Sequence, residues 1–440
     1  MFGFLTKLRR DQRGNALVIA CAAMPMVIGC AGLATDTIQW TLWKRQLQRA
    51  ADSAAIAGVY DRLSAADATT NTATAVCNDL AVNVHTSQPL MATSPCTGST
   101  GSYSSLAFPA DSANETDHVQ VTLKIQHSLP FSSMFLSTPP IITATATAAA
   151  IGSTGYACIE SLDTSTATGI TFSGGATIEM PNCDVFSNSS ATNAAVGKGS
   201  TSVIANSIGA VGGVQQSNNF SVNAYKPYSS QLPDPFSSIT PDPNDMHCVS
   251  STLTAGTNIS SLPAGTNCFS GLNVGSNTTL NLTGKLSGPI YINGGDVKLQ
   301  GNFTCTGCTI ILTNTDTSST AHIGQITVNA GVNNNITAPT DGVYKGIAIY
   351  QDRRAAICTG NCNNLNGNSS SIITGAIYTP KQEVYYNGSG TLTATCTMFV
   401  SYRVTFNGNS SLSNKFQDLS QCTSAGLPGP SASRVVRLVA

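Results

Sequence analysis

Residues 289–312 read PIYINGGDVKLQGNFTCTGCTIIL, and this stretch carries the pattern that decides the fold of most of the chain. Short apolar runs rich in β-branched residues alternate with glycine and asparagine, which punctuate turns. The same pattern recurs from Tyr156 onward, where charged residues become rare. The strand-length runs occupy residues 169–172, 201–204, 271–274, 279–282, 289–292, 296–299, 309–312, 325–328, 346–349, 375–378 and 403–406.

Several of these runs lie only about 7 to 10 residues apart, which is too close for helical crossovers and is typical of a solenoid. We therefore predict that residues 156–422 form a right-handed parallel β-helix, in which stacked coils share one apolar core and asparagine side chains ladder between coils. An antiparallel β-sandwich shows similar turn spacing and is the alternative. Residues 215–247 contain five prolines and are predicted to be a long loop that interrupts the coils.

Cysteine usage indicates the compartment of this region. Two of the 14 cysteines, Cys21 and Cys30, lie in an N-terminal apolar run, which leaves twelve beyond it and only five scattered histidines to share a metal. This composition predicts disulfides in an oxidising space. The candidates at loop-closing distances are Cys77/Cys96, Cys158/Cys183, Cys248/Cys268 and Cys396/Cys422, whereas Cys305/Cys308 and Cys358/Cys362 are closely spaced.

The two closely spaced pairs also invite other interpretations. A zinc site would need two well-spaced pairs, and the three-residue gap between Cys358 and Cys362 is a poor match. A redox dithiol after Cys305 would need a βαβ context, which this β-rich region lacks. Local or neighbouring disulfides are therefore favoured, with the connectivity left open.

The N-terminal apolar run, residues 16–34, carries no charge and is long enough to cross a bilayer as one helix. Four basic residues precede it, which favours a cytoplasmic N-terminus, although three more follow between residues 44 and 49. We predict a cytoplasmic segment 1–14, a transmembrane helix 15–35 in the bacterial inner membrane, and a periplasmic or extracellular remainder. The residues expected to mark the span and its interface are Ala16, Leu17, Val18, Ile19, Pro25, Leu33, Trp40 and Trp43.

Cleavage of this run is the alternative. A secretory signal would end at a small-residue site after a shorter core, and Val27 to Cys30 resembles a lipobox. The run instead passes without a polar gap into a segment of helical periodicity, residues 36–63. Its apolar side is predicted to hold Ile38, Leu42, Leu47, Ala50, Ala54 and Ala57. We therefore expect the anchor to be retained.

The N-terminal region of the chain resembles a known protein family. Residues 13–19 (RGNALVI), Pro25, residues 32–36 (GLATD) and residues 47–55 (LQRAADSAA) resemble the N-terminal region of TadG-like proteins, in the TadE/TadG group of Flp (tight-adherence) pilus assembly. The resemblance is strongest over residues 10–60 and continues weakly through a small α+β region, 36–150. It implies an inner-membrane, pseudopilin-like protein that helps to build or anchor an adhesive pilus.

Two departures limit what the resemblance implies. The fifth position after Gly14 is Ile19 where prepilins carry glutamate, so we do not predict prepilin-peptidase cleavage. Many TadG-like proteins also carry a von Willebrand A-like metal motif. Asp163, Thr164 and Ser165 begin such a pattern, but Ala167 stands at its next serine position, and we predict no metal site.

Enzymatic activity is a candidate function because many parallel β-helices cleave acidic polysaccharides. Residues 314–316 (NTD) match one short motif of such enzymes, and Asp352 with Arg353 and Arg354 could place a base beside a carboxylate. The other motifs of these enzymes are missing, so a solvated loop pair is favoured. We predict no enzyme and no cofactor. With a net charge of −1 and no basic patch beyond the membrane flank, we also predict no nucleic-acid partner.

The predicted function is that of a structural component of Flp/Tad pilus assembly. Its expected partners are the membrane and pilus-assembly proteins or pseudopilins, which could pack on the small-residue face that Gly29 and Gly32 give the span. A glycan is a further candidate partner, and the alternative function is a membrane-tethered glycan-binding adhesin, followed by a polysaccharide lyase. The tail, residues 423–440, ends in an apolar run expected to be a free strand seeking a partner.

Overall fold

The computed structural model describes residues 13–64, 69–84, 90–91, 94–95, 101–112, 115–153, 156–286, 288–366, 371–388, 391–394, 396–414, 419–429 and 433–439. The chain divides into two compact units. The first holds Met1–Gly152 with Val436–Ala440, and the second holds Ser153–Val435. Each unit is described by itself below.

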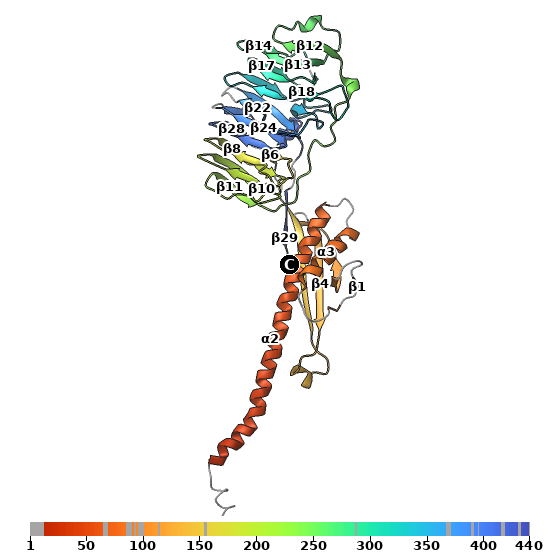
Figure 1. Cartoon of the computed structure of the whole chain (residues 1–440), viewed down its shortest axis with the longest axis vertical. Coiled ribbons are helices and arrows are strands. Elements are labelled where there is room, and N and C mark those ends of the chain that lie inside the picture. The colour runs from red at the N-terminus through yellow and green to blue at the C-terminus, as the bar shows by residue number, and fades with distance from the viewer. Residues whose placement is uncertain are drawn as a thin grey trace, which may run out of the picture. The chain divides into compact units, whose positions relative to one another are not determined.

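The first unit combines two helices with a small sheet (Figure 1). Helix α2 (Arg13–Ser64) is followed by α3 (Thr69–Asn83). The sheet has the order β29-β5-β4-β3, with β3 at Ser105–Ala107, β4 at Glu115–Gln126, β5 at Ile141–Ser153 and β29 at Ser433–Leu438. A short pair, β1 (Ser94–Pro95) and β2 (Ser102–Tyr103), and the 3-10 helix η1 (Ser132–Met134) complete it.

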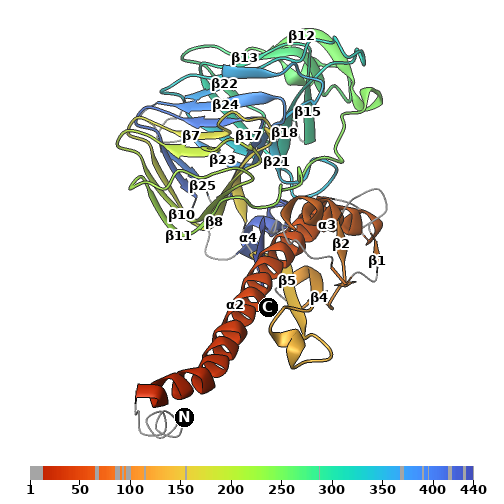
Figure 2. The ribbon, with the colours of Figure 1, turned by 60° about the horizontal axis from the view of Figure 1, so that its bottom comes forward.

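Alternating side chains create the core of this unit. Along β4, Val119, Val121, Leu123 and Ile125 are fully buried, as the two-residue period of a strand with one covered face requires. The matching face of β5 presents the alanines 144, 146, 148 and 150, whose small side chains let α2 approach closely. Figure 2 shows β4 and β5 beside α2.

The tail contradicts the prediction of a free strand. Residues 419–424 form helix α4, and residues 433–438 form β29, which pairs with β5. The N–H of Val439 donates to the carbonyl oxygen of Thr147 at 2.9 Å. That edge of β5 is thereby paired within the chain, and β29 becomes the edge strand of the sheet in its place.

The second unit is a stack of short strands. The strands are β6 (Ala157–Ser161), β7 (Ile170–Phe172), β8 (Thr177–Ser187), β9 (Ala195–Gly197), β10 (Ser202–Ala210), β11 (Phe220–Lys226), β12 (Cys248–Thr254), β13 (Cys268–Val274), β14 (Thr279–Asn281), β15 (Gly288–Asn293), β16 (Val297–Leu299), β17 (Asn302–Thr306), β18 (Cys308–Thr313), β19 (Ile326–Val328), β20 (Asn334–Thr337), β21 (Ile347–Gln351), β22 (Cys358–Asn366), β23 (Ile372–Thr379), β24 (Gln382–Asn387), β25 (Thr391–Ala394), β26 (Thr397–Ser401), β27 (Val404–Phe406) and β28 (Ser411–Asn414). The 3-10 helices η2 (Pro243–Asp245) and η3 (Ile259–Ser261) lie in the connections.

All pairings among these strands in the described part of the chain are parallel. The prediction of a parallel β-helix is confirmed, and the antiparallel sandwich is wrong. The right-handed sense of the coil stays a prediction.

The order of the coils differs from the order of the sequence (Figure 1). From β12 the stack runs through β13, β15, β18, β21, β23 and β26, and β26 then pairs with β6. The stack continues from β6 through β8 and β10 to β11. The chain therefore enters the solenoid at an internal coil, winds to one end, crosses to the other end and winds back to its starting coil.

The segment that crosses between the two ends is residues 227–247, called the strap below. It occupies most of the predicted proline-rich loop 215–247, but that loop begins too early, because residues 220–226 form β11 and stack in register on β10. The strap itself contains no strand among its residues, all of which the structure describes.

The core of the solenoid consists of side chains in register from coil to coil. One column holds Ile310, Ile349, Ile377, Phe399, Ile159, Val185 and Ile208, all of them buried. Side-chain hydrogen bonds also join the coils. The side-chain oxygen of an asparagine accepts a backbone N–H at 2.9 Å in three places: Asn267 from residue 247, Asn293 from residue 315, and Asn302 from residue 333. These asparagines therefore bond to the neighbouring backbone rather than to one another.

Candidate functional site

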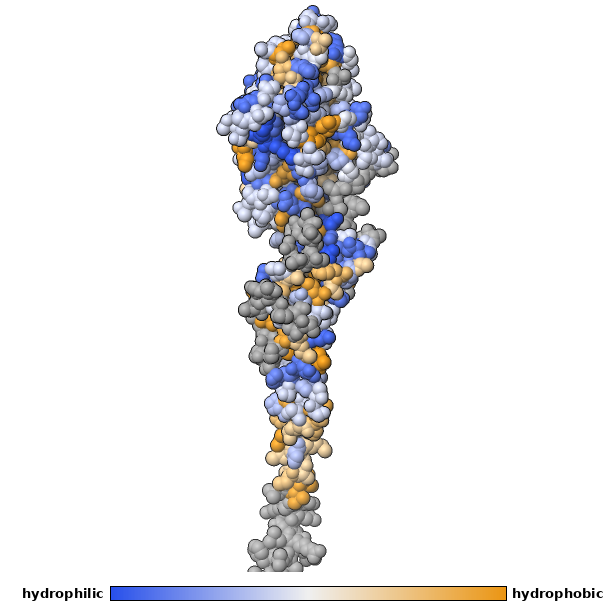
Figure 3. Space-filling model, turned by 90° about the vertical axis from the view of Figure 1, so that its right-hand side faces the viewer, coloured by the Kyte–Doolittle hydropathy of each residue, from blue (hydrophilic) through white to orange (hydrophobic). Residues whose placement is uncertain are grey.

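The N-terminal part of α2 presents apolar side chains to the surroundings. Val18, Met26 and Ile28 are 64%, 74% and 55% exposed. Ile19 and Leu33 are exposed as well, and Pro25 lies within the helix. Ala16 and Leu17 belong to the same predicted set, but their side chains lie outside the described ones. The exposed part of α2 forms the largely apolar column just above the grey atoms at the lower end of Figure 3.

Among the described residues, one helix is long and apolar enough to cross a membrane, at Val18–Leu63, by length and composition. Only 6% of its most apolar window is buried within the protein, which sets it apart from the buried helix of a soluble core. Single-pass anchoring near the N-terminus fits these properties.

The character of α2 changes at Trp43. This side chain is only 4% exposed and packs its ring edge-on against His127, with the ring centroids 6.3 Å apart. Trp40 packs, partly buried, against the same core. Trp43 is therefore covered by the protein rather than left open to an interface, because the helix meets the β4–β5 sheet at this level, and the interfacial position expected for Trp40 stays a prediction. Leu47, Ala50 and Ala54 lie on the buried face as predicted, whereas Ile38 and Leu42 are exposed.

The tip of the β4–β5 hairpin contacts α2 just below this point. The carboxylate of Asp36, 4% exposed, accepts the backbone N–H of Ser132 at 2.6 Å. One turn earlier on the helix, a Cβ placed on Gly32 would overlap with the ring of Phe131. Gly32 therefore packs on its own chain. Further along the tip, Met134, Phe135 and Leu136 point apolar side chains outward and are 75%, 68% and 46% exposed.

The structure places ten of the twelve outer cysteines in disulfides whose partners are both described. The pairs are Cys158–Cys183, Cys248–Cys268, Cys305–Cys308, Cys358–Cys362 and Cys396–Cys422. Cys77 is disulfide-bonded too, and Cys96 lies outside the described residues. The two cysteines of the apolar run, Cys21 and Cys30, are free and exposed.

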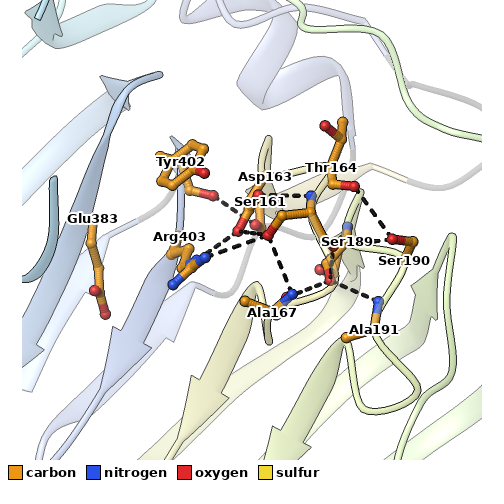
Figure 4. A network of polar contacts seen from close by, with 12 residues as sticks. Ser161, Asp163, Thr164, Ala167, Ser189, Ser190, Ala191, Glu383, Tyr402 and Arg403 are labelled. Atoms are coloured by element: carbon orange, nitrogen blue, oxygen red, sulfur yellow. Dashed lines mark hydrogen bonds and ion pairs between the residues drawn. The ribbon is translucent and has the colours of Figure 1, made fainter. Parts of the chain in front are cut away.

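A polar network joins the first and last coils of the solenoid (Figure 4). Arg403 donates from Nε to Oδ2 of Asp163 at 2.6 Å, and Ser165 donates its backbone N–H to Oδ1 of Asp163 at 2.9 Å. Ser161 donates its hydroxyl to the carbonyl oxygen of Tyr402 at 2.8 Å. Burial acts to raise the pKa of Asp163, but the hydrogen bonds from Ser165 and Arg403 outweigh it and hold that pKa below its ordinary value.

The side chains of this network bond to one another and hold the two coils together. Asp163 and Ser165, which begin the metal-like motif, bond to each other and to Arg403. Across the residues that the structure describes, no group of three or more histidine, cysteine, aspartate or glutamate side chains could hold a metal ion. We call the contact between the coil of β26–β27 and the coil of β6 the seam.

The strap is held by a second cluster. Arg353 lies 3.1 Å from Oδ2 of Asp234 and donates to the carbonyl oxygens of Phe236 and Ser237 at 2.5 and 2.8 Å. Tyr378 donates its hydroxyl to Asp234 at 2.8 Å, and the Phe236 ring packs edge-on against the Tyr378 ring at 5.3 Å. Arg353, a candidate catalytic base by sequence, thus fastens the strap to the coils.

The neighbouring charges of the sequence motif are paired as well. Arg354 forms two hydrogen bonds with Oδ2 of the buried Asp352, the shorter at 2.7 Å, and contacts the carbonyl oxygen of Asp316. Asp316 is exposed, and hydrogen bonds from Ser318 lower the pKa of its carboxyl. Together with Arg353, these residues hold loops against the coils. Their charges therefore have a structural role in the fold.

Glu160 differs from the other carboxylates. It is fully buried in the coil of β6, and neither carboxylate oxygen has a hydrogen-bond partner. Burial, and secondarily the negative charge of Asp234, raise the pKa of Glu160 to about 8. Sequence reasoning missed this residue. The only signal was a glutamate inside an apolar strand, Ala157 to Ser161.

Comparison with known proteins identifies one segment of the chain. Residues 14–68 match the model of the Tad family, the Flp pilus-assembly TadE/G-like proteins. The match covers α2 from Gly14 onward and the four residues that follow the helix, and it confirms the resemblance found over residues 10–60. No curated protein and no solved structure matches the chain.

Proposed function

We propose that the chain is an inner-membrane-anchored structural component of Flp/Tad pilus assembly, with a cytoplasmic N-terminus and its solenoid in the periplasm or outside the cell. The family match supports the pathway, since it falls on the anchoring helix itself. The apolar, exposed side chains from Val18 to Leu33 support the anchor. The disulfides of the solenoid support an oxidising compartment.

One observation carries the proposal: α2 is a single helix, 52 residues long, that is apolar and exposed over one part and packed into a folded core over the next. A helix of this kind can lie in the bilayer beside the helices of pilins or pseudopilins while its folded unit stays outside. Pilus-assembly proteins or pseudopilins are therefore the proposed partners. The helix face around Gly29, where a Cβ would meet nothing within 4 Å, remains open to such a neighbour.

The solenoid is proposed to act without catalysis, as a rigid extension. Its core is continuous from coil to coil, and the charged residues weighed as catalytic candidates form internal ion pairs. A stack of this kind offers a long surface of hydroxyl and amide groups for lateral contact with a protein. A glycan is retained as a second ligand class for the same surface.

The test is deletion of the gene in a piliated host, followed by counting of surface pili and membrane fractionation. The wild-type chain should restore pili. The double variant Val27→Lys/Ile28→Lys should be absent from the membrane fraction and should fail to restore pili, because two charges in the span oppose its insertion into the bilayer. Gln46→Lys, on the exposed side of α2 beyond the apolar run, is the matched control and should restore pili.

The alternatives give different outcomes. Normal pilus numbers in the deletion strain, with loss of attachment to a surface, would overturn the assembly role in favour of an adhesin. Release of reducing or unsaturated sugar ends by the purified chain would instead indicate a lyase, and Arg353→Ala should then abolish it.

A further inference from the structure

We propose that the β4–β5 hairpin tip, residues 130–136, inserts its apolar side chains into the outer-leaflet interface of the bilayer that α2 crosses. The geometry pointing to this is the contact of the tip with α2 at Gly32 and Asp36. The inference rests on the proposed function for two steps, that α2 spans a membrane and that its N-terminus is cytoplasmic.

The position of the tip along the helix sets its depth. The uncharged run, residues 16–34, is about 28 Å long at 1.5 Å per residue, which matches the hydrocarbon core of a bilayer. Asp36 is the first charged residue after that run. Because Gly32 packs on Phe131 and Asp36 accepts the N–H of Ser132, the tip lies where hydrocarbon gives way to headgroups.

The composition of the tip suits lipid better than water. From Ser128 to Ile141 there is no charged residue, and Met134, Phe135 and Leu136 are exposed together on one short turn. Exposed apolar side chains that cluster in this way mark an interaction surface. Aromatic and aliphatic residues at a membrane interface bury that area among acyl chains, while the backbone of the turn remains near polar headgroups.

The polar groups of the contact are already satisfied by the protein. The carboxylate of Asp36 is buried against the tip and accepts the Ser132 N–H, so it can lie beside the hydrocarbon without being left unpaired. Trp43 does not supply an interfacial anchor, because it is buried in the core, and Trp40 is partly covered by the same core. The tip adds an interfacial contact of its own, with Phe135 as its most exposed aromatic side chain.

The experiment uses the full chain in vesicles of phosphatidylethanolamine and phosphatidylglycerol that contain lipids brominated either near the carbonyl or near the methyl end of the acyl chains. Tryptophan is introduced singly as Val27→Trp, Phe135→Trp or Val82→Trp, and the wild-type chain, with Trp40 and Trp43, gives the background. Val82 is the matched control, since it is 70% exposed against 68% for Phe135 and lies on α3.

We expect the added fluorescence of Phe135→Trp to shift to the blue and to be quenched by bromine near the carbonyl. Val27→Trp should be quenched most by bromine near the methyl end, and Val82→Trp by neither. If the fluorescence of Val27→Trp is quenched and that of Phe135→Trp is not, the proposed insertion of the tip is overturned, while the proposed membrane anchor stands. If Val27→Trp is also unquenched, the proposed anchor itself fails.

A protein neighbour is the competing occupant of the tip. Benzoylphenylalanine at position 135, irradiated in cell membranes, should give only lipid adducts. A cross-link to a second polypeptide, whether a copy of this chain or another protein, would overturn the proposal.

Discussion

The guanidinium of Arg403 donates from Nε to the carboxylate of Asp163 at 2.6 Å across the seam, although 240 positions separate the two residues. The side chain of Asp163 is 1% exposed and that of Arg403 is 22% exposed. The two residues meet because the coil that comes last in the sequence stacks on the coil that comes first, with β26 paired to β6 and β27 paired to β7. The two halves of the solenoid, which are far apart in the chain, are closed into one stack there.

Arg403→Ala should weaken this closure. The buried carboxylate would lose its charged partner, and we expect the free energy of unfolding of the solenoid to fall by about 1.5–3 kcal/mol. Lys298→Ala is the matched control. It removes a cation that lies 3.4 Å from Asp296 with both side chains largely exposed, and should change stability by less than about 1 kcal/mol. Denaturant unfolding of the full chain in detergent measures both, and equal losses would contradict a special role of the seam.

The pH dependence of the seam follows from the lowered pKa of Asp163. A carboxyl whose pKa is lower in the folded than in the unfolded state stabilises the fold fully above its unfolded pKa, and this stabilisation is lost as pH falls through the folded pKa. Wild type should therefore be more stable than Asp163→Asn near neutral pH, and the gap should narrow under acid. Unfolding midpoints measured at several pH values test this, and a gap that widens under acid would refute it.

Glu160 should give the opposite slope. Its pKa is raised to about 8 by burial and by the charge of Asp234, so its favourable state is the protonated one. That stability is complete below the unfolded pKa and is lost as pH rises through the folded value. Glu160→Gln should therefore exceed wild type in stability above pH 8, by a few kcal/mol at about 1.4 kcal/mol per pKa unit.

The control for this slope is Asp341→Asn, which removes an exposed carboxylate from the same unit. Its free energy of unfolding should follow that of wild type from pH 4.5 to pH 9. If the difference in free energy between Glu160→Gln and wild type stays constant over the same range, Glu160 is not held protonated in the fold.

The disulfides should differ in strength according to the length of chain they close. Cys158–Cys183 spans 25 positions and Cys305–Cys308 spans three. Chain-entropy arguments give about 3.5 kcal/mol for the longer loop and about 1.5 kcal/mol for the shorter one. The double variants Cys158→Ser/Cys183→Ser and Cys305→Ser/Cys308→Ser should therefore rank in that order in denaturant unfolding. The reverse order would show that local packing, rather than loop closure, dominates.

Much of the fold was predictable from local pattern. Runs such as residues 309–312 identify a strand by composition, and their spacing identifies a stack, because a single coil cannot bury its own face. The apolar run of residues 16–34 likewise indicates a span. These inferences need only neighbours in sequence.

The order of the coils could not be predicted in this way. Nothing local in residues 157–161 shows that β6 pairs with β26, because any strand with a similar apolar pattern fits the stack equally well. The roles of Arg353 and Trp43 were missed for the same reason. Each depends on a partner far away in the chain, Asp234 of the strap and His127 of the hairpin, and a residue type alone does not reveal which surface will cover it.

The two glycines of the span provide a test of the hairpin contact. A Cβ at Gly32 would overlap with the Phe131 ring, whereas a Cβ at Gly29 would have nothing within 4 Å. Gly32→Ala should therefore displace Phe131 and weaken the hydrogen bond from Ser132 to Asp36, at a cost of about 1–3 kcal/mol for overpacking. Hydrogen exchange of the Ser132 amide in reconstituted membranes should speed up accordingly. Gly29→Ala, the matched control, adds the same methyl group one turn earlier on the helix. It should leave the exchange of the Ser132 amide unchanged, because the methyl group meets no neighbour there and alanine favours the helix. Equal protection in both variants would mean that the tip is not held by Gly32, and its position along α2 would then have to come from Asp36 alone.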